Sequence, residues 1–388
     1  MDKKWTAVLL VSMLLMACGK MNDSAKPVQA DDIPVVRIAT AAPLSGAIAH
    51  LGKDNELGVK MAIDDLNASG LVIGQTRVRL EMVSEDDAGD PKQGTAIAQK
   101  FVDMKVNGVV GHFNSGVTIP ASKIYSAAGI PEISPSSTNP KYTRQGFKTA
   151  FRLVADDIQL GGAMARFAVN TLKARRIAII DDRTAYGQGV ADEFEKAAKA
   201  ANASIVGREF TTDKSTDFNA ILTKLKAAHA DVIFFGGQDA VGGPMLRQMK
   251  ALGINLKFLG GDGLCTGEMA KLSGDALGDD VVYCAEAGGV EGEFEKKMLE
   301  WKAEFRRRYG VDVQLYAANA YDAVNVLVAA MMKAGSADPA IYLPQVSKVQ
   351  IKGLTGPIAF DEKGDILQGA LTLSTFRGGK KEPIGIVR

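Results

Sequence analysis

The residues with the clearest potential for ligand chemistry are hydroxyl-bearing side chains that follow two predicted strands. The run Ser115-Gly-Val-Thr118 comes after a strand that ends at Val110, and the run Ser136-Ser137-Thr138 comes after a short strand that Ile133 closes. Neighbouring strand ends of this kind present hydroxyls and free backbone N–H groups to one crevice. Such groups hold a carboxylate without a formal positive charge. The two runs therefore predict the carboxylate half of an amino-acid binding cleft.

The segments that must position these hydroxyls alternate between strand and helix patterns. In a first run, strands are expected at 35–39, 77–82 and before Val110, and helices at 57–66, after Asp90-Pro91, and at 120–128, with Pro120 at the first helical position. A second run has strands at 177–180, 204–210, 232–235, 258–259 and 281–283, and helices at 187–201, 218–228, 244–252 and 294–309. Consecutive βαβ units predict parallel, doubly wound sheets, and two such runs predict two similar lobes.

Length and composition narrow the class of protein. A chain of 388 residues is long enough for two domains. Its 46 Lys and Arg balance 45 Asp and Glu, for a net charge of +1, so bulk electrostatics gives no case for nucleic acid as a partner. A hydrophobic content of 46% with 41 glycines is typical of an α/β protein with many short turns. No apolar run approaches the roughly 18 residues of a membrane-spanning helix.

The N-terminus has the pattern of a targeting segment. Lys3-Lys4 supplies a basic region, and residues 7–16 supply an apolar region too short to span a bilayer. The run Leu15-Met-Ala-Cys18 resembles the cleavage box of bacterial lipoproteins, which predicts a signal peptide over residues 1–17 and a lipid on Cys18. An ordinary signal peptide with a chance cysteine is the alternative. Residues 18–33 are polar and aperiodic, as in a flexible tether, so we expect a folded part in the periplasm or cell envelope, anchored to a bacterial membrane.

The remaining cysteines form an even pair. With Cys18 assigned to lipid, Cys265 and Cys284 are expected to form a disulfide in an oxidising compartment. They enclose a loop of modest length, so a bridge would stabilise the fold by roughly 3 kcal/mol. Two buried free thiols are the alternative. No metal site is expected, because none of the three histidines lies near these cysteines in sequence.

Several motifs, in order along nearly the whole mature chain, carry a resemblance to a known family. They are Pro43-Leu-Ser-Gly46, Asp86-Asp-Ala-Gly-Asp-Pro-Lys-Gln93, Gly111-His-Phe-Asn-Ser115, Ile133-Ser-Pro-Ser-Ser-Thr138, Tyr186-Gly187, Gly260-Gly-Asp-Gly263 and Asp361-Glu-Lys-Gly-Asp365. Together they resemble the extracytoplasmic leucine/isoleucine/valine-binding proteins of ABC importers. Each motif is weak alone, and the set specifies the family more than the ligand.

The resemblance implies a type I periplasmic binding protein fold. In this fold, two doubly wound parallel-sheet lobes are joined by a three-crossing hinge and clamp the ligand between them. The crossings are expected near Ala155, Glu286 and Phe360. Lobe one would then comprise residues 34–155 and 287–359, and lobe two residues 156–286 and 360–388.

The resemblance also implies roles for residues at the polar end of the cleft. Ser115 and Thr138 match positions whose hydroxyls and backbone N–H groups receive the ligand carboxylate, with Ser136 and Ser137 beside them. Capping of the following helices is the alternative role for these hydroxyls. Asp262 matches an acid that receives the ligand ammonium, with the Ser136 carbonyl and Thr138 hydroxyl completing the set, and leucine-preferring relatives have Glu there. A solvated loop aspartate is the alternative.

The walls around the ligand side chain depart from the family pattern. Tyr186 matches a tyrosine that closes over the ligand, although a packing tyrosine at a helix start is the alternative. Leu51 and Gln238 stand where relatives often carry aromatics, and Phe113 and Asn114 complete the wall. The predicted pocket is therefore roomier and more polar. Leucine, isoleucine or valine is the expected ligand, and another small carboxylate or amide, larger, more polar or aromatic, is the alternative.

The predicted disulfide is a second departure. In relatives a bridge joins the positions of Gly89 and Asn114, neither of which is a cysteine here. A bridge between Cys265 and Cys284 would instead tie the loop after Asp262 to the strand leading toward a crossing. We therefore expect it to fix the ammonium-binding loop.

Two other classes of protein compete with a binding protein. For an enzyme, Tyr186-Gly-Gln-Gly189 lacks the third glycine of a dinucleotide loop, and no Ser-His-Asp arrangement or HExxH helix is present. His50, His112 and His229 are scattered, and His112 is expected to be structural. We expect no catalytic residues and no cofactor. A ligand sensor with the same fold is the other class, but no spanning helix or signalling domain follows Arg388.

The expected partners follow from the resemblance. They are an amino acid and the permease subunits of an ABC importer, with no nucleic acid. The membrane is expected to be contacted through the lipid anchor only, and the protein is expected to be a monomer.

Overall fold

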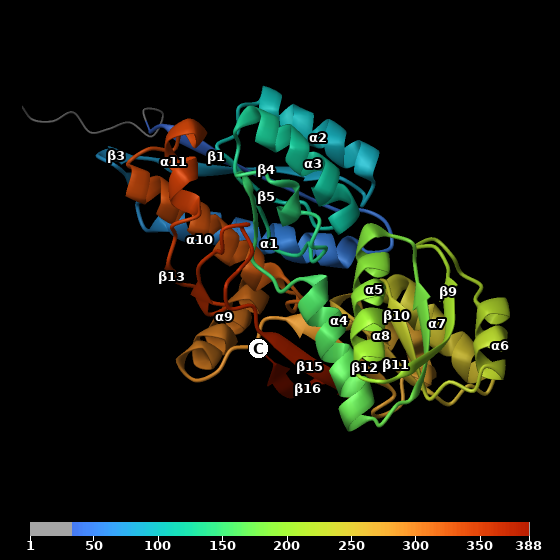
Figure 1. The fold of residues 1–388 in the computed structure, drawn as a ribbon. Coiled ribbons are helices and arrows are strands. Elements are labelled where there is room, and N and C mark those ends of the chain that lie inside the picture. Colours follow the sequence, from blue (N-terminus) through green and yellow to red (C-terminus); the bar gives the residue numbers. More distant parts are fainter. Residues whose placement is uncertain (1–32, 388) are drawn as a thin grey trace, which may run out of the picture. The chain divides into compact units, whose positions relative to one another are not determined.

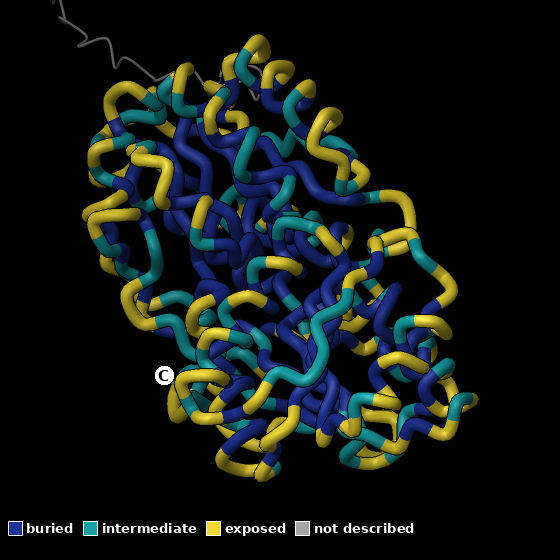
Figure 2. Tube along the Cα trace, turned by 45° about the vertical axis from the view of Figure 1, so that its right-hand side comes forward, coloured by how far each residue is buried: buried dark blue, intermediate teal, exposed yellow. Residues whose placement is uncertain are grey.

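A computed structural model describes residues 33–387 of the chain. The predicted signal peptide and Cys18 lie outside the described residues, as does the predicted tether apart from Ile33. Two sheets organise the described part, each with helices on both faces (Figure 1). In Figure 2 the buried segments run through the interior of both lobes, and the exposed ones lie on the outer turns of helices and loops.

Lobe one is built around a five-stranded parallel sheet in the order β4-β1-β5-β6-β7. Its strands are β1 (Val35–Ala42), β4 (Arg79–Asp86), β5 (Gly108–Gly111), β6 (Glu132–Ser134) and β7 (Ala150–Arg152). Successive strand residues face opposite sides of a sheet. Ile38 therefore packs with the helices α1 (Ala49–Ala68) and α10 (Ala317–Ala334), and Ala39 with α2 (Pro91–Asp103) and α3 (Ser115–Ala128), which cover the other face (Figure 1).

Lobe two is built around a seven-stranded sheet in the order β16-β15-β12-β11-β10-β8-β9. Its parallel strands are β8 (Arg176–Asp181), β9 (Ser204–Phe210), β10 (Val232–Gly236), β11 (Lys257–Gly260) and β12 (Val282–Ala287). Phe234 packs with α4 (Asp157–Arg166) and α5 (Ala185–Ala200) on one face. Phe235 packs on the other face with α6 (Asn219–Ala227), α7 (Asp239–Ala251) and α8 (Met269–Ser273).

Two antiparallel strands extend the second sheet, which the parallel pattern did not predict. They are β15 (Leu371–Arg377), which pairs with β12, and β16 (Lys380–Val387). Gly378 and Gly379 both have positive φ, at 55° and 72°, which is the conformation that a two-residue hairpin turn requires. The Gly-Gly pair was therefore the available signal for this hairpin.

Three predicted helix starts are wrong. The helix predicted from residue 244 begins at Asp239, with Pro244 in its interior. Pro120 lies inside α3, which begins at Ser115 with Asn114 at its N-cap, because the helix starts directly after the turn that ends β5. The helix predicted from residue 57 begins at Ala49, without a side-chain cap that would mark its start. The predicted end of α3 is correct, since Gly129 adopts the left-handed conformation there.

The remaining elements complete the lobes and the connections between them. The chain passes between the two sheets three times: from β7 to α4, from β12 to α9 (Glu293–Tyr309), and between β14 (Pro357–Ile358) and β15.

The sequence did not predict α4, α10 or α11 (Pro339–Val346). The short strands are β2 (Val72–Ile73), β3 (Thr76–Arg77) and β13 (Ile351–Lys352), and 3-10 turns lie at Thr143–Gln145, Asp262–Leu264 and Gly274–Ala276.

No single helix within residues 33–387 is long and apolar enough to cross a membrane. The pair α10 and α11, bent by 112°, passes such a test only when taken together.

Candidate functional site

The carboxyl ends of β5 and β6 meet those of β10 and β11 across a cleft between the lobes. A small cavity there is lined from lobe one by Phe113, Asn114, Ser115, Ser136, Leu315 and Tyr316, and from lobe two by Tyr186, Gln238, Asp262 and Gly263. Most of the predicted site residues are among them. The cavity has a volume of about 10 Å³, close to what one water molecule needs. An amino acid therefore enters only if the lobes open or side chains move.

Two of the predicted hydroxyls line the lobe-one wall. Ser115 lies at the start of α3, where its Oγ accepts a hydrogen bond from the Asn139 N–H at 3.2 Å. The Ser136 Oγ donates to the Phe113 carbonyl at 3.1 Å. Backbone N–H groups in the first turn of a helix have no partner within that helix, so the start of α3 adds donors to the same wall. This wall can receive a carboxylate.

The other two hydroxyls of the second run do not line the cavity. Ser137 is tied to the protein: its N–H donates to Ser134 Oγ at 2.9 Å, and its own Oγ donates to the Phe113 carbonyl at 3.1 Å. Thr138 is buried, and its hydroxyl lies near the carboxylate of Asp157. Neither the Thr138 hydroxyl nor that carboxylate makes a well-formed hydrogen bond among the described residues. Ser137 is thus structural, while Thr138 keeps an unused hydroxyl.

Asp157 was not predicted as a site residue. It begins α4, directly after the first passage between the lobes, and it is fully buried. Burial raises the pKa of Asp157 well above its usual range, and the nearby charge of Asp262 raises it further. A buried acid beside the cleft had no signal in the sequence, because Asp156-Asp157 has the pattern of an ordinary helix start.

Asp262 and Tyr186 form the polar part of the lobe-two wall. Asp262 follows β11 and is buried, and its Oδ1 accepts from the Gly263 N–H at 3.1 Å. The same N–H donates to the Tyr186 hydroxyl at 3.0 Å. Burial raises the pKa of Asp262 to about 7 from an ordinary 3.8, although the Tyr186 hydroxyl acts in the opposite direction. Among residues 33–387, no charged side chain of opposite sign is a main influence on this carboxylate.

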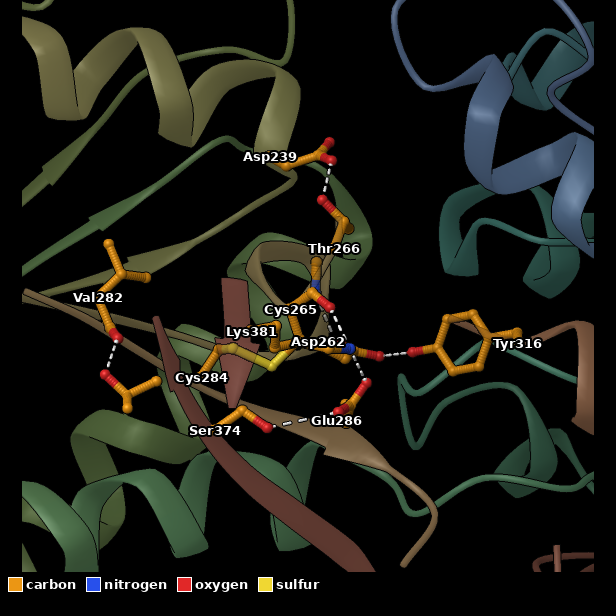
Figure 3. Close-up of a disulfide and its surroundings, with 12 residues drawn as sticks. Asp239, Asp262, Cys265, Thr266, Val282, Cys284, Glu286, Tyr316, Ser374 and Lys381 are labelled. Atoms are coloured by element: carbon orange, nitrogen blue, oxygen red, sulfur yellow. Dashed lines mark hydrogen bonds and ion pairs between the residues drawn. A yellow bond between two sulfur atoms is a disulfide. The ribbon is translucent and has the colours of Figure 1, made fainter. Parts of the chain in front are cut away.

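Tyr316 was not predicted, yet it touches the centre of the site. Its hydroxyl donates to Asp262 Oδ2 from across the cleft (Figure 3). Tyr316 is held by Asp54 of α1, whose carboxylate accepts the backbone N–H groups of four consecutive residues, Gln314 to Ala317, at 2.7–3.0 Å. Burial raises the pKa of Asp54 to about 6, although hydrogen bonds from these backbone N–H groups lower it. Asp54 thus fixes the start of α10 and the position of Tyr316.

The wall predicted for the ligand side chain is only partly assembled. Phe113, Asn114 and Gln238 line the cavity. Leu51 does not line it, but is fully buried in a cluster with Phe113 and Tyr316. The Asn114 Oδ1 and Gln238 Oε1 atoms are buried and have no hydrogen-bond partner within the described part of the chain.

A disulfide joins Cys265 to Cys284 on β12, next to the turn that carries Asp262 (Figure 3). The Lys381 ammonium donates to the Cys265 carbonyl at 2.7 Å and pairs with Glu286 at 2.6 Å. The turn is therefore attached to the second sheet both covalently and through Lys381. The role of the bridge in fixing the ammonium-binding loop stays a prediction.

Two further contacts cross the cleft. The Asn139 side chain of lobe one donates to the Ala185 carbonyl of lobe two at 2.7 Å. The His50 Nε2 of α1 lies 2.8 Å from the Asp239 Oδ2 at the start of α7, and Thr266 donates to the same oxygen at 2.5 Å (Figure 3). Burial alone would lower the pKa of His50, but the Asp239 carboxylate raises it overall.

A second histidine, His112, was expected to be structural, and its hydrogen-bond partners lie within lobe one. His112 is buried, with Nδ1 2.8 Å from Asp87 Oδ2 and Nε2 3.0 Å from the Tyr125 hydroxyl. Both ring nitrogens are therefore used in packing the lobe. Among residues 33–387 no group of three or more His, Cys, Asp or Glu side chains could hold a metal ion.

Known proteins resemble the chain over most of its length. The family model for periplasmic binding proteins matches residues 35–380. The Leu/Ile/Val-binding protein homolog 1 of Brucella abortus is 36% identical over 331 residues, which cover 85% of this chain and 87% of that protein. A leucine-, isoleucine-, valine-, threonine- and alanine-binding protein of Pseudomonas aeruginosa is 34% identical over 331 residues, with the same coverage.

Solved structures agree with this assignment. A leucine-binding protein of Thermotoga maritima superposes with a TM-score of 0.83 at 25% identity, over 91% of this chain and 98% of that one. The branched-chain amino acid transporter substrate-binding protein of Streptococcus pneumoniae, in complex with isoleucine, gives 0.82 at 26% identity, over 91% and 99%. The predicted type I fold is confirmed, and the chain belongs to the periplasmic binding protein family.

Proposed function

We propose that this protein captures an α-amino acid between its lobes and delivers it to the permease of an ABC importer. Leucine, isoleucine and valine are the expected ligands, because the relatives described above carry these names. The observation that carries the proposal is a pair of opposite walls around one cavity, with Ser115 and the start of α3 on one side and Asp262 on the other. An α-amino acid presents a carboxylate and an ammonium that match these two walls.

On binding, the ligand carboxylate would accept hydrogen bonds from Ser115, Ser136 and the first N–H groups of α3. Hydrogen bonds to a charged group contribute about 1.5–3 kcal/mol each. The Thr138 hydroxyl, in the next part of the same loop, is buried and has no hydrogen-bond partner among the described residues. The ammonium would replace the Tyr316 hydroxyl at Asp262, and its charge would keep the Asp262 carboxylate ionised.

Closure would couple the two lobes. We place lobe one at residues 34–155 and 287–359 and lobe two at 156–286 and 360–388. A ligand that contacts both lobes stabilises the closed arrangement over the open one by its differential affinity. The contacts from Asn139 to Ala185 and from His50 to Asp239 would add to this stabilisation. The permease would recognise the closed form.

The proposal places the folded part outside the cytoplasm. A signal peptide over residues 1–17 and a lipid on Cys18 would attach the protein to a membrane of the cell envelope. The protein would act as a monomer, without a cofactor and without catalysis.

Calorimetric titration of the ligand-stripped protein against all common amino acids tests this function. Tight binding of leucine, isoleucine or valine, with one site per chain, is the expected result. Binding of an aromatic acid or an aliphatic amide, with no response to any amino acid, would reject the ligand class and leave the fold untouched. Asp262 favours the first result, because an aromatic acid or an aliphatic amide has no ammonium to pair with its carboxylate.

A further inference from the structure

Two side-chain amides stand at corresponding places in the two lobes. Asn114 is the N-cap of α3 after β5, and Gln238 is the N-cap of α7 after β10. Neither side chain caps its own helix, although asparagine in this position usually does. Both carbonyl oxygens are buried and without a hydrogen-bond partner among residues 33–387. The two amides are therefore available to a third group.

Both amides lie where the inner cavity joins a larger outer one. Asn114 and Gln238 line the inner cavity and also an outer cavity of about 550 Å³. A methyl group added at Gly263 would come within 2.5 Å of the Gly237 carbonyl oxygen and 2.7 Å of Gln238 Oε1, and one at Gly89, which has a positive φ, within 3.3 Å of Asn114 Oδ1. A ligand side chain that extends from the inner cavity toward the outer one would run along their shared lining, which also includes Ser115 and Tyr186.

The outer cavity contains a third acceptor. Asp182, in the turn from β8 to α5, lines this cavity. Its Oδ1 accepts from the Thr184 N–H at 3.0 Å and from the Thr184 hydroxyl at 2.6 Å. Its Oδ2 is buried and has no partner within the described part of the chain. A methyl group at Gly237 would come within 2.8 Å of that oxygen, and closer still to the Phe235 ring, at 2.3 Å.

Unpaired buried polar atoms disfavour an apolar ligand side chain at this point. A branched apolar side chain would leave both amides without hydrogen bonds. Buried polar groups without a hydrogen-bond partner weaken binding. A side chain that carries an amide both donates and accepts, so it satisfies a facing amide whichever way that amide is turned.

We propose that the cleft also takes α-amino acids with an unbranched side chain that ends in an amide, held between Asn114 and Gln238 and extending toward Asp182. The inference rests on the proposed function, because the α-carbon end of such a ligand would bind at Ser115 and Asp262 as described above. Asn114 and Gln238 would then determine specificity.

Calorimetric titrations with glutamine, norleucine and leucine test this assignment. Norleucine has an unbranched apolar side chain of nearly the same length as that of glutamine. Each ligand is titrated into the unchanged protein, into Gln238→Leu, and into the control Gln99→Leu, which changes an exposed glutamine of α2. We expect glutamine to bind about thirtyfold more tightly than norleucine, as two hydrogen bonds of about 1 kcal/mol each would give.

The two variants test whether Gln238 itself selects the ligand side chain. Gln238→Leu should reverse the order, so that norleucine binds more tightly than glutamine, while Gln99→Leu should keep the original order. If norleucine or leucine binds and glutamine does not, the inference is overturned and the proposed function stays intact. An order that Gln238→Leu does not change would also overturn it. If no α-amino acid binds, the proposed function itself is overturned, and this inference with it.

Discussion

The two walls of the cleft are held in place by different means. In lobe one, Ser136 on the cavity wall and Ser137 next to it in the loop both bond back to the carbonyl of Phe113, so neutral groups are fixed by their own backbone. On the lobe-two wall, a buried acid stands on a turn that is attached through a disulfide and Lys381. Among the described residues, the first wall has no charged side chain that needs a ligand as its partner. The second contains a charge that only a cation fully stabilises, so we expect changes there to have the larger effects.

Removing the charge of the lobe-two wall should have the largest effect. Asp262→Asn keeps the size of the side chain but cannot pair with an ammonium. Loss of one partner of a desolvated charge pair costs about 2–5 kcal/mol, so amino-acid affinity should fall at least about thirtyfold. Calorimetry measures the loss. Asp275→Asn, at an acid whose side chain is 90% exposed, is the matched control and should bind normally.

Opening the disulfide should weaken the same wall indirectly. The bridge closes a loop with a sequence separation of 19 residues, so a Cys265→Ser, Cys284→Ser double variant should lose roughly 3 kcal/mol of unfolding free energy. Its amino-acid affinity should fall as well, because the turn that carries Asp262 loses an attachment. Denaturant unfolding and calorimetry check the two effects. An unchanged melting temperature together with unchanged affinity would contradict the role assigned to the bridge.

The lobe-one wall offers a matched pair of serines. Ser115→Ala removes a hydroxyl that lines the cavity and should weaken amino-acid binding by about 2 kcal/mol, roughly thirtyfold. Ser137→Ala removes a hydroxyl bonded within the protein, so it should lower the unfolding free energy by about 1–2 kcal/mol and change affinity little. Titration and thermal unfolding of both variants give the comparison. Equal losses of affinity would show that the wall acts as one unit.

The pH dependence of binding should show the smallest of these effects. The pKa of Asp262 is raised to about 7 in the folded protein, so the carboxyl is mostly protonated at pH 6 and mostly ionised at pH 8. Affinity for an ammonium should therefore fall about tenfold from pH 8 to pH 6. Asp262→Asn should remove this dependence, and a flat profile in the unchanged protein would contradict it.

The same titration affects stability with the opposite sign. Because the folded protein binds the Asp262 proton more tightly than the unfolded chain does, this group lowers the unfolding free energy as pH rises from about 4 to about 7. Asp54 and Asp182, whose pKa values burial raises to about 6, act in the same direction.

The sequence predicted those parts of the site that lie directly after a strand. Ser115, Ser136, Asp262 and Gln238 follow predicted strands, and parallel strand ends meet at one edge. Ser137 could not be separated from its neighbours in this way. The three residues Ser136 to Thr138 have the same chemistry, and only the path of the loop decides which one faces the cavity.

Other parts depend on contacts between distant segments. Tyr316 reaches Asp262 across 54 residues, and Asp54 reaches the start of α10 across more than 260. Neither has a local pattern, since α1 begins without a side-chain cap and α10 was not predicted. The hairpin of β15 and β16, by contrast, had a local signal in Gly378-Gly379.

The central claim is that Asp262 and the start of α3 recognise the two charged groups of one α-carbon. The most direct measurement compares leucine with 4-methylpentanoic acid, the same molecule without its amino group, by calorimetric titration of the unchanged protein. The account predicts that leucine binds and that the acid binds at least about thirtyfold more weakly, because it leaves Asp262 without a cation. Equal affinity for the two would contradict it.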